Sequence, residues 1–167
     1  MKIICVGLNY QSHNKEMQRE LSKKEDDPVL FMKPDTALLV ADKQNFYIPD
    51  FSSDIHYEAE LVVKMGKNIA ERFAHRYYNE ITIGIDFTAR DIQSELKKKS
   101  LPWEISKAFD NSAAIGSFIS KDKLEKSIDN LNFELSINEK VVQIGHTTEM
   151  IHSVDKIIAY ASRFFTL

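Results

Sequence analysis

The sequence predicts an α+β fold that is rich in β-structure. Short apolar stretches bounded by turn residues fill much of the 167-residue chain, and this pattern is typical of strands. Few segments, such as 90–99, repeat apolar residues at helical spacing. Segments 131–138 and 141–145 flank the turn residues Asn138 to Lys140, which predicts a β-hairpin. Strands therefore dominate, with a few peripheral helices.

Each element is predicted from apolar spacing and from the residues that end it. Strands are expected where apolar residues run or alternate between turn residues, at 2–8, 29–33, 36–40, 55–63 and 80–86, with a short extended piece at 46–49. Helices are expected at 9–25, 68–78 and 90–99. A last helix is expected after Ser153, because serine caps helix N-termini well and an apolar stripe follows it.

Composition predicts one globular domain over residues 1–167. The hydrophobic share of 43% and the charged share of 28% are ordinary for such a domain. A net charge of -3 argues against nucleic acid as a partner. The first apolar run is short for an export signal, and no run approaches the roughly 20 residues of a membrane-spanning helix. We therefore expect a cytoplasmic protein that uses no membrane.

Several classes of site lack their sequence patterns. The chain has five glycines, and none falls in a dinucleotide-binding or phosphate-binding motif. The single cysteine, Cys5, lies in an apolar run and is expected in the core instead of acting as a nucleophile. Acidic and other polar clusters must therefore carry any chemistry.

Glu58 and Glu60 form the most informative cluster. Their i, i+2 spacing within a predicted strand directs both carboxylates to the same face, where they can share a divalent cation. A solvated strand face would show the same alternation. The apolar character of the surrounding residues favours burial instead, and buried carboxylates need a cation or hydrogen-bond donors.

Two further clusters could supply a base and a third acid. His13 and Glu16 are spaced i, i+3, so a helix would place the carboxylate beside the imidazole and raise its basicity. A surface ion pair is the alternative. Asp86 ends a predicted strand, and Arg90 and Gln93 follow it; exposed charges around a helix cap are the alternative there.

A lysine among aromatic residues completes the set. Lys107 lies between Trp103 and Phe109, where it could place a positive charge in an apolar site. The alternative is a surface lysine whose stem covers the aromatic rings.

Five segments, in this order, resemble the fumarylacetoacetate hydrolase family. They are GLNYQSHNKEM at 7–17, LFMKPDTALL at 30–39, IHYEAELVV at 55–63, IGIDFTARDIQ at 83–93 and LPWEISKAFD at 101–110. The resemblance implies the mixed-sheet roll of the family's C-terminal domain. It points to short, single-domain members that hydrolyse acylpyruvates or decarboxylate oxaloacetate.

The resemblance also implies a role for each residue. Glu58, Glu60 and Asp86 match metal ligands, usually for Mg²⁺ or Mn²⁺. His13 and Glu16 match a water-activating pair, Lys107 an oxyanion-stabilising lysine, and Arg90 and Gln93 substrate contacts. The expected reaction is metal-dependent hydrolysis of a carbon–carbon bond in a 2,4-dioxo acid through an enolate. Decarboxylation of oxaloacetate and isomerisation of a 2-oxo acid on the same site are the alternatives.

The resemblance has one gap. The family continues beyond the last helix with a glycine-rich closing strand and a Thr-Gly-Thr-Pro turn, which this sequence does not contain. We therefore expect a catalytic domain lacking its C-terminal closing strands, or else a metal-binding module without activity. A homodimer is also implied, because family members commonly form one.

Overall fold

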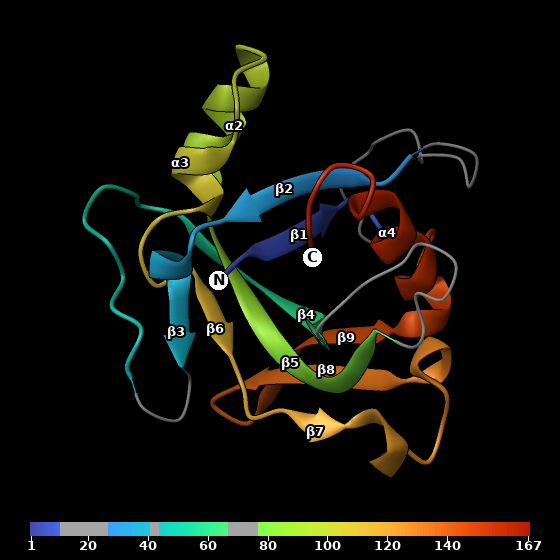
Figure 1. Ribbon diagram of the computed structural model, residues 1–167. Helices are drawn as coiled ribbons and strands as arrows, with labels where there is room; N and C mark the ends of the chain where they lie inside the picture. Colours follow the sequence, from blue (N-terminus) through green and yellow to red (C-terminus); the bar gives the residue numbers. More distant parts are fainter. Residues whose placement is uncertain (11–26, 41–43, 67–76) are drawn as a thin grey trace. The chain divides into compact units, whose positions relative to one another are not determined.

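β-Structure predominates in the computed structural model, which describes residues 1–10, 27–40, 44–66 and 77–167 (Figure 1). The chain divides into two compact units. Unit 1 comprises Met1–Cys5, Met32–Val62 and Thr82–Phe118, and unit 2 comprises Val6–Phe31, Val63–Ile81 and Ile119–Leu167. The expected α+β, β-rich fold of the family's C-terminal-domain type is confirmed. The prediction of one domain over 1–167 stays a prediction.

A mixed sheet organises unit 1. Its strand order is β3 (Leu38–Val40), β6 (Ala113–Ile115), β5 (Tyr78–Ala89) and β4 (Ile55–Met65). β6 runs parallel to β3 and antiparallel to β5. At Gly84 on β5, an added Cβ would lie 2.9 Å from both the Ala114 carbonyl oxygen and a Val62 methyl, so a residue without a side chain is required.

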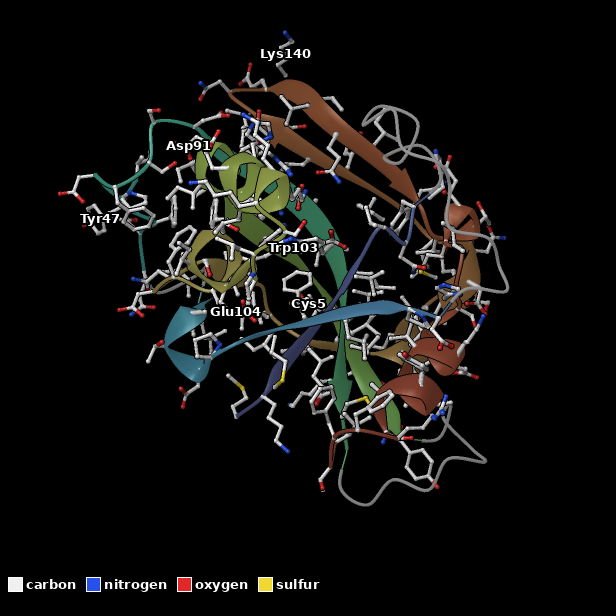
Figure 2. The ribbon with its side chains drawn as sticks, turned by 90° about the horizontal axis from the view of Figure 1, so that it is seen from above. Cys5, Tyr47, Asp91, Trp103, Glu104 and Lys140 are labelled. Carbon is white, nitrogen blue, oxygen red and sulfur yellow. The ribbon has the colours of Figure 1, made fainter. Side chains whose placement is uncertain are left out.

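Two helices follow the long strands of unit 1 and pack against each other. They are α2 (Arg90–Lys98), which begins directly after β5, and α3 (Glu104–Lys107). Figure 2 labels Asp91 in the first turn of α2 and Trp103 and Glu104 where α3 begins. The Asp91 carboxylate accepts hydrogen bonds from Ser52 Oγ at 2.7 Å and from the Ser53 amide at 3.0 Å. This acid therefore fixes the preceding loop to the helix start.

The N-terminal strand pairs with the segment that carries Lys33. β1 (Ile3–Gly7) and β2 (Val29–Lys33) form a two-stranded sheet. β2 ends at Lys33 because Pro34 follows, and proline has no amide hydrogen with which to continue the ladder. A short 3-10 helix, η1 (Asp35–Ala37), then leads into β3.

A β-hairpin and a capped helix characterise unit 2. β8 (Asn132–Ile137) and β9 (Lys140–His146) are antiparallel, and the turn between them uses positive φ angles at Asn138 (50°) and Glu139 (66°). Figure 2 shows Lys140 at this turn. α4 (Val154–Ala161) begins after Ser153, whose Oγ accepts a hydrogen bond from the Lys156 amide at 3.3 Å. The remaining short elements are β7 (Ile119–Ser120), which pairs with β5, η3 (Lys121–Lys123), η4 (Ile128–Asn130) and η5 (Thr147–Glu149).

Most predicted elements that fall on described residues are confirmed, with local corrections. The structure confirms the strands predicted at 2–8, 29–33 and 55–63. It also confirms the hairpin and the helices predicted at 90–99 and after Ser153. The predicted strand 36–40 is wrong in its first half, because η1 occupies 35–37. Segment 46–49 forms no strand, and Tyr78, predicted helical, begins β5. The predicted helices 9–25 and 68–78 lie almost entirely outside the described residues.

Candidate active site

The candidate site lies in unit 1, where β4, β5, α2 and α3 each contribute side chains. β4 carries Glu58 and Glu60, and the end of β5 carries Asp86 and Thr88. The residues from the two helices are Arg90, Gln93 and Lys107. Segments far apart in the sequence thus bring together every predicted site residue that the structure describes.

Lys107 is the centre of this cluster. Its ammonium donates hydrogen bonds to Glu58 Oε2 at 2.7 Å, to Asp86 Oδ2 at 2.7 Å and to Thr88 Oγ1 at 2.6 Å. Only 5% of the residue is exposed, so the predicted alternative of a solvent-facing lysine is wrong. Burial opposes the charge, but Asp86 and Glu58 outweigh it and raise the pKa of Lys107. The amine is therefore protonated at neutral pH.

Glu58 is held by cations on both of its oxygens. Lys107 contacts Oε2, and the Arg90 guanidinium donates to Oε1. Arg90 also donates from Nη1 to Gln93 Oε1 at 2.6 Å, and its buried Nε has no acceptor among the described residues. Burial alone would raise the pKa of Glu58, but Lys107 and Arg90 lower it to about 2. This carboxylate is therefore ionised and fixed in orientation.

Glu60 has the opposite electrostatics although it lies two residues from Glu58 on the same strand. Burial, followed by repulsion from Asp86 and Glu58, raises the pKa of Glu60 to about 8. Within the described part of the chain its side chain makes neither a hydrogen bond nor an ion pair. Glu60 is half-buried, and the charge of Lys107 opposes the rise in its pKa without offsetting it.

The three predicted ligand carboxylates fit a hard divalent cation by their chemistry. Asp86 and Glu58 are close enough to Glu60 to raise its pKa, and oxygen donors are those that Mg²⁺ and Mn²⁺ prefer. The described residues contain no group of three or more acidic, His or Cys side chains already arranged around a metal position. The Lys107 ammonium instead lies between two of the three carboxylates.

A second lysine, Lys33, belongs to the same cluster, although the sequence pattern did not indicate a role for it. Its Nζ lies 2.8 Å from Asp86 Oδ1 and donates to the carbonyl oxygen of Lys107. The residue is 1% exposed. Burial is the largest influence on it and lowers the pKa of Lys33, against the opposing effect of Asp86. The sequence feature that could have indicated this role is a lysine at the end of an apolar strand, within the family-like segment 30–39.

His13 and Glu16, the predicted water-activating pair, lie outside the described residues. His56, on the acidic strand, is 3.2 Å from Asp54 and has a 47% exposed side chain. Cys5, labelled on β1 in Figure 2, has its pKa raised to about 12 by burial and then by Asp86, so its thiol stays protonated at neutral pH.

A cavity of about 830 Å³ also lies in unit 1 but is separate from the carboxylates. Apolar side chains such as Met32, Phe51, Ile105 and Phe109 line most of it. Of the cluster, Lys33 alone reaches its wall. The polar chemistry of the unit is therefore concentrated at Lys107 and not in this cavity.

Comparison with known proteins agrees with the motif resemblance. Residues 2–167 match the family described as fumarylacetoacetate (FAA) hydrolase C-terminal. An oxaloacetate tautomerase of Escherichia coli is 39% identical over 99% of this chain and 75% of its own length. A mitochondrial oxaloacetate decarboxylase of Dictyostelium discoideum is also 39% identical, with 99% and 76% covered.

A solved structure matches at the level of the backbone. A fumarylpyruvate hydrolase from Pseudomonas aeruginosa, in complex with Mn²⁺ and pyruvate, has a TM-score of 0.88 and 31% identity, covering 99% of this chain and 72% of that one. Among the described residues, no helix is long and apolar enough to cross a membrane.

Proposed function

The chain belongs to the fumarylacetoacetate hydrolase family, whose relatives carry the names of enzymes, and on that premise we propose that it converts a small 2-oxo acid through an enolate. The first substrate we propose is oxaloacetate, because relatives at 39% identity are named for it. The observation that carries the proposal is the buried Lys107 ammonium, 2.7 Å from each of two carboxylates.

Lys107 would stabilise the negative charge that develops on the keto oxygen. When a proton leaves C3 of oxaloacetate, or when the C3–C4 bond breaks and carbon dioxide departs, the electron pair moves toward that oxygen. A buried ammonium is a strong hydrogen-bond donor to such an oxyanion. Because Glu58, Asp86 and Thr88 already engage this amine, one of these acceptors must turn aside for the substrate.

Arg90 and Gln93 would bind and orient the substrate carboxylate. The Arg90 Nε donor has no acceptor among the described residues, and a guanidinium pairs well with a carboxylate. Gln93, 2% exposed, holds the guanidinium through its Oε1. These contacts would set which end of the acid faces Lys107.

Glu58, Glu60 and Asp86 are the residues that would hold the proposed Mg²⁺ or Mn²⁺. When bound, the cation would supply positive charge next to the 2-oxo acid. Glu60 is the acid that such a charge would benefit most, because repulsion from its two neighbours keeps its pKa high.

Hydrolysis of an acylpyruvate is the second candidate reaction. The observation that favours it is the similarity to the fumarylpyruvate hydrolase with Mn²⁺ and pyruvate. In this reaction water adds to the distal acyl carbonyl and the carbon–carbon bond breaks, leaving the pyruvate enolate beside Lys107. His13 and Glu16 would activate the water.

The proposal also includes a homodimer in the cytoplasm, both implied by the motif resemblance and the composition. Light scattering on the purified full chain would measure the oligomeric state, and a mass of one chain would remove the dimer. Relatives named mitochondrial show that location varies within the family.

Kinetics on two substrates test the proposed function. Loss of enol-oxaloacetate absorbance and release of pyruvate would be followed with Mn²⁺ and with EDTA, and pyruvate release from acetylpyruvate would be measured in parallel. We expect turnover that requires the metal and falls about 1,000-fold in Lys107→Met, while the exposed-lysine control Lys98→Met keeps it. A wild-type chain that accelerates none of these reactions would overturn the proposal.

A further inference from the structure

Lys33 is a buried lysine whose amine makes four contacts of 3.0 Å or less inside unit 1. Its Nζ lies 2.8 Å from Asp86 Oδ1 and 3.0 Å from both the carbonyl oxygen and Oγ of Ser112. It also donates to the carbonyl oxygen of Lys107. Only 1% of the residue is exposed and its amine is already engaged by these groups, so we consider a role that acts through its partners.

The first partner is the backbone that carries Lys107. α3 has only four residues, and a helix this short does not hold its own end in place. The Lys107 carbonyl oxygen instead accepts from Lys33 Nζ and from Ser112 Oγ, the latter at 2.9 Å. Ser112 is fully buried. Two buried donors therefore fix the main chain from which the Lys107 amine extends.

The second partner is Asp86. Its Oδ1 pairs with Lys33 and its Oδ2 with Lys107, each within 2.8 Å. The two lysines together determine the rotation of this carboxylate. Removal of Lys33 would free Oδ1 and allow the carboxylate to turn away from Glu58 and Glu60.

Burying an ammonium costs more than burying a neutral hydrogen-bond donor. A neutral side chain could tie the Lys107 and Ser112 carbonyls together, whereas only a cation also neutralises Asp86. We infer that Lys33 is a positioning residue: it sets the Lys107 main chain and the Asp86 carboxylate in the geometry that the reaction uses. This inference rests on the proposed function of Lys107 and Asp86.

Three full-length variants test the inference. Lys33→Met keeps an unbranched side chain that is one heavy atom shorter and removes all four contacts. Ser112→Ala removes only the hydroxyl and leaves the pair of Lys33 with Asp86 intact. Lys98→Met, at an exposed position of the same unit, is the matched control.

The expected results separate positioning from general stability. Lys33→Met should lower kcat about 100-fold with KM within threefold of wild type. It should also weaken Mn²⁺ binding 10- to 100-fold in calorimetry. Ser112→Ala should lower kcat by a smaller factor and leave Mn²⁺ affinity unchanged, because Asp86 keeps its partner. A crystal structure of Lys33→Met without metal should show Lys107 Nζ displaced from Glu58 and Asp86.

Each alternative result has one meaning. If Lys33→Met is folded and keeps wild-type kcat and Mn²⁺ affinity, the inference is overturned while the proposed function stands. If Lys33→Met does not fold, Ser112→Ala decides, and an unchanged kcat there overturns it. If wild type itself is inactive, the proposed function fails, and the crystal structure still decides the inference: an undisplaced Lys107 amine overturns it, and a displaced one supports it.

Discussion

The two units bury polar groups of different kinds. In unit 1 the buried polar cluster is ionic, with Lys33 and Lys107 facing Glu58 and Asp86. In unit 2 two of the buried polar side chains, those of Asn9 and Thr147, bind backbone groups as neutral partners. The Asn9 side chain accepts from the His152 amide at 2.8 Å and donates to the His152 carbonyl at 3.0 Å.

This difference indicates what each set of polar groups is for. Neutral hydrogen bonds to backbone satisfy groups that the chain must bury in any case. A buried ion cluster costs desolvation energy, and apolar residues of similar size often stabilise a protein as well or better. We therefore attribute the two lysines and three acids of unit 1 to the proposed reaction and not to a gain in stability.

The largest expected effect breaks the ion cluster at its centre. Lys107→Met leaves Glu58 and Asp86 without their shared cation, so in EDTA the free energy of unfolding should fall by about 3–5 kcal/mol. Urea denaturation measures this value, with Lys98→Met as the control. Saturating Mn²⁺ should recover part of the loss. Equal stability of wild type and Lys107→Met in EDTA would contradict the ionic account of unit 1.

The pH dependence of metal binding is the next effect in size. Because the pKa of Glu60 is raised to about 8, binding must release a proton at lower pH. Mn²⁺ affinity should rise by about tenfold per pH unit up to about 8 and then level off. Without metal, the stability of the fold changes with pH in the opposite direction. Folded Glu60 holds its proton more tightly than unfolded Glu60, so the free energy of unfolding falls as pH rises from 4.5 to about 8.

Glu60→Gln should remove both of these dependences, because the amide does not titrate. Calorimetry and urea denaturation between pH 5 and pH 9 would measure them. Wild-type and Glu60→Gln profiles that overlay would show that another group is responsible.

A change in unit 2 should affect packing and leave the chemistry intact. An added Cβ at Gly145 would overlap the Phe133 ring, so Gly145→Ala should cost about 1–3 kcal/mol of unfolding free energy. Mn²⁺ affinity should not change. Phe133→Leu in the same chain should recover part of the loss, because a smaller side chain then faces residue 145. Additive losses would indicate that the two residues do not compete for space.

The neutral hydrogen bonds of unit 2 should have a smaller effect. Thr147→Val removes the hydroxyl that accepts from the Leu131 amide at 2.8 Å, and should cost about 1–2 kcal/mol in urea denaturation. The neighbouring exposed Thr148→Val is the control. Identical unfolding curves for the two variants would remove the contribution assigned to this bond.

The smallest effect is expected at an exposed ion pair of unit 2. Lys64 and Glu80 lie 2.6 Å apart, but their side chains are 54% and 42% exposed. Glu80→Gln should change the free energy of unfolding by less than about 0.5 kcal/mol. A larger loss would mean that exposed ion pairs contribute as much to the free energy of unfolding as the buried cluster does.

Local sequence patterns predicted most of the fold and part of the site. Alternating apolar residues located the acidic strand and the hairpin, because these signals lie within one element. The same patterns could not locate β6, whose three residues are bordered by a parallel and an antiparallel neighbour. Residues 112–120 carry no periodic signal, so only tertiary pairing reveals that strand.

The sequence predicted which residue types form the site, but not which of them pair with each other. Glu58 and Glu60 look equivalent in the strand pattern, yet the pKa of one is about 2 and that of the other about 8. The difference arises because Lys107, 49 residues away from Glu58 in sequence, contacts only one of them as an ion pair. Lys33 and Ser112 were missed for the same reason, since their partners are distant in the chain.

Titration of the full chain with Mn²⁺ tests the central claim most directly. Calorimetry at pH 8 would compare wild type with the Glu58→Gln/Glu60→Gln double variant and with the exposed-acid control Glu80→Gln/Glu95→Gln. The account predicts one tight site in wild type and in the control, and affinity reduced by more than about 100-fold in the double variant. Unchanged affinity in the double variant would contradict it.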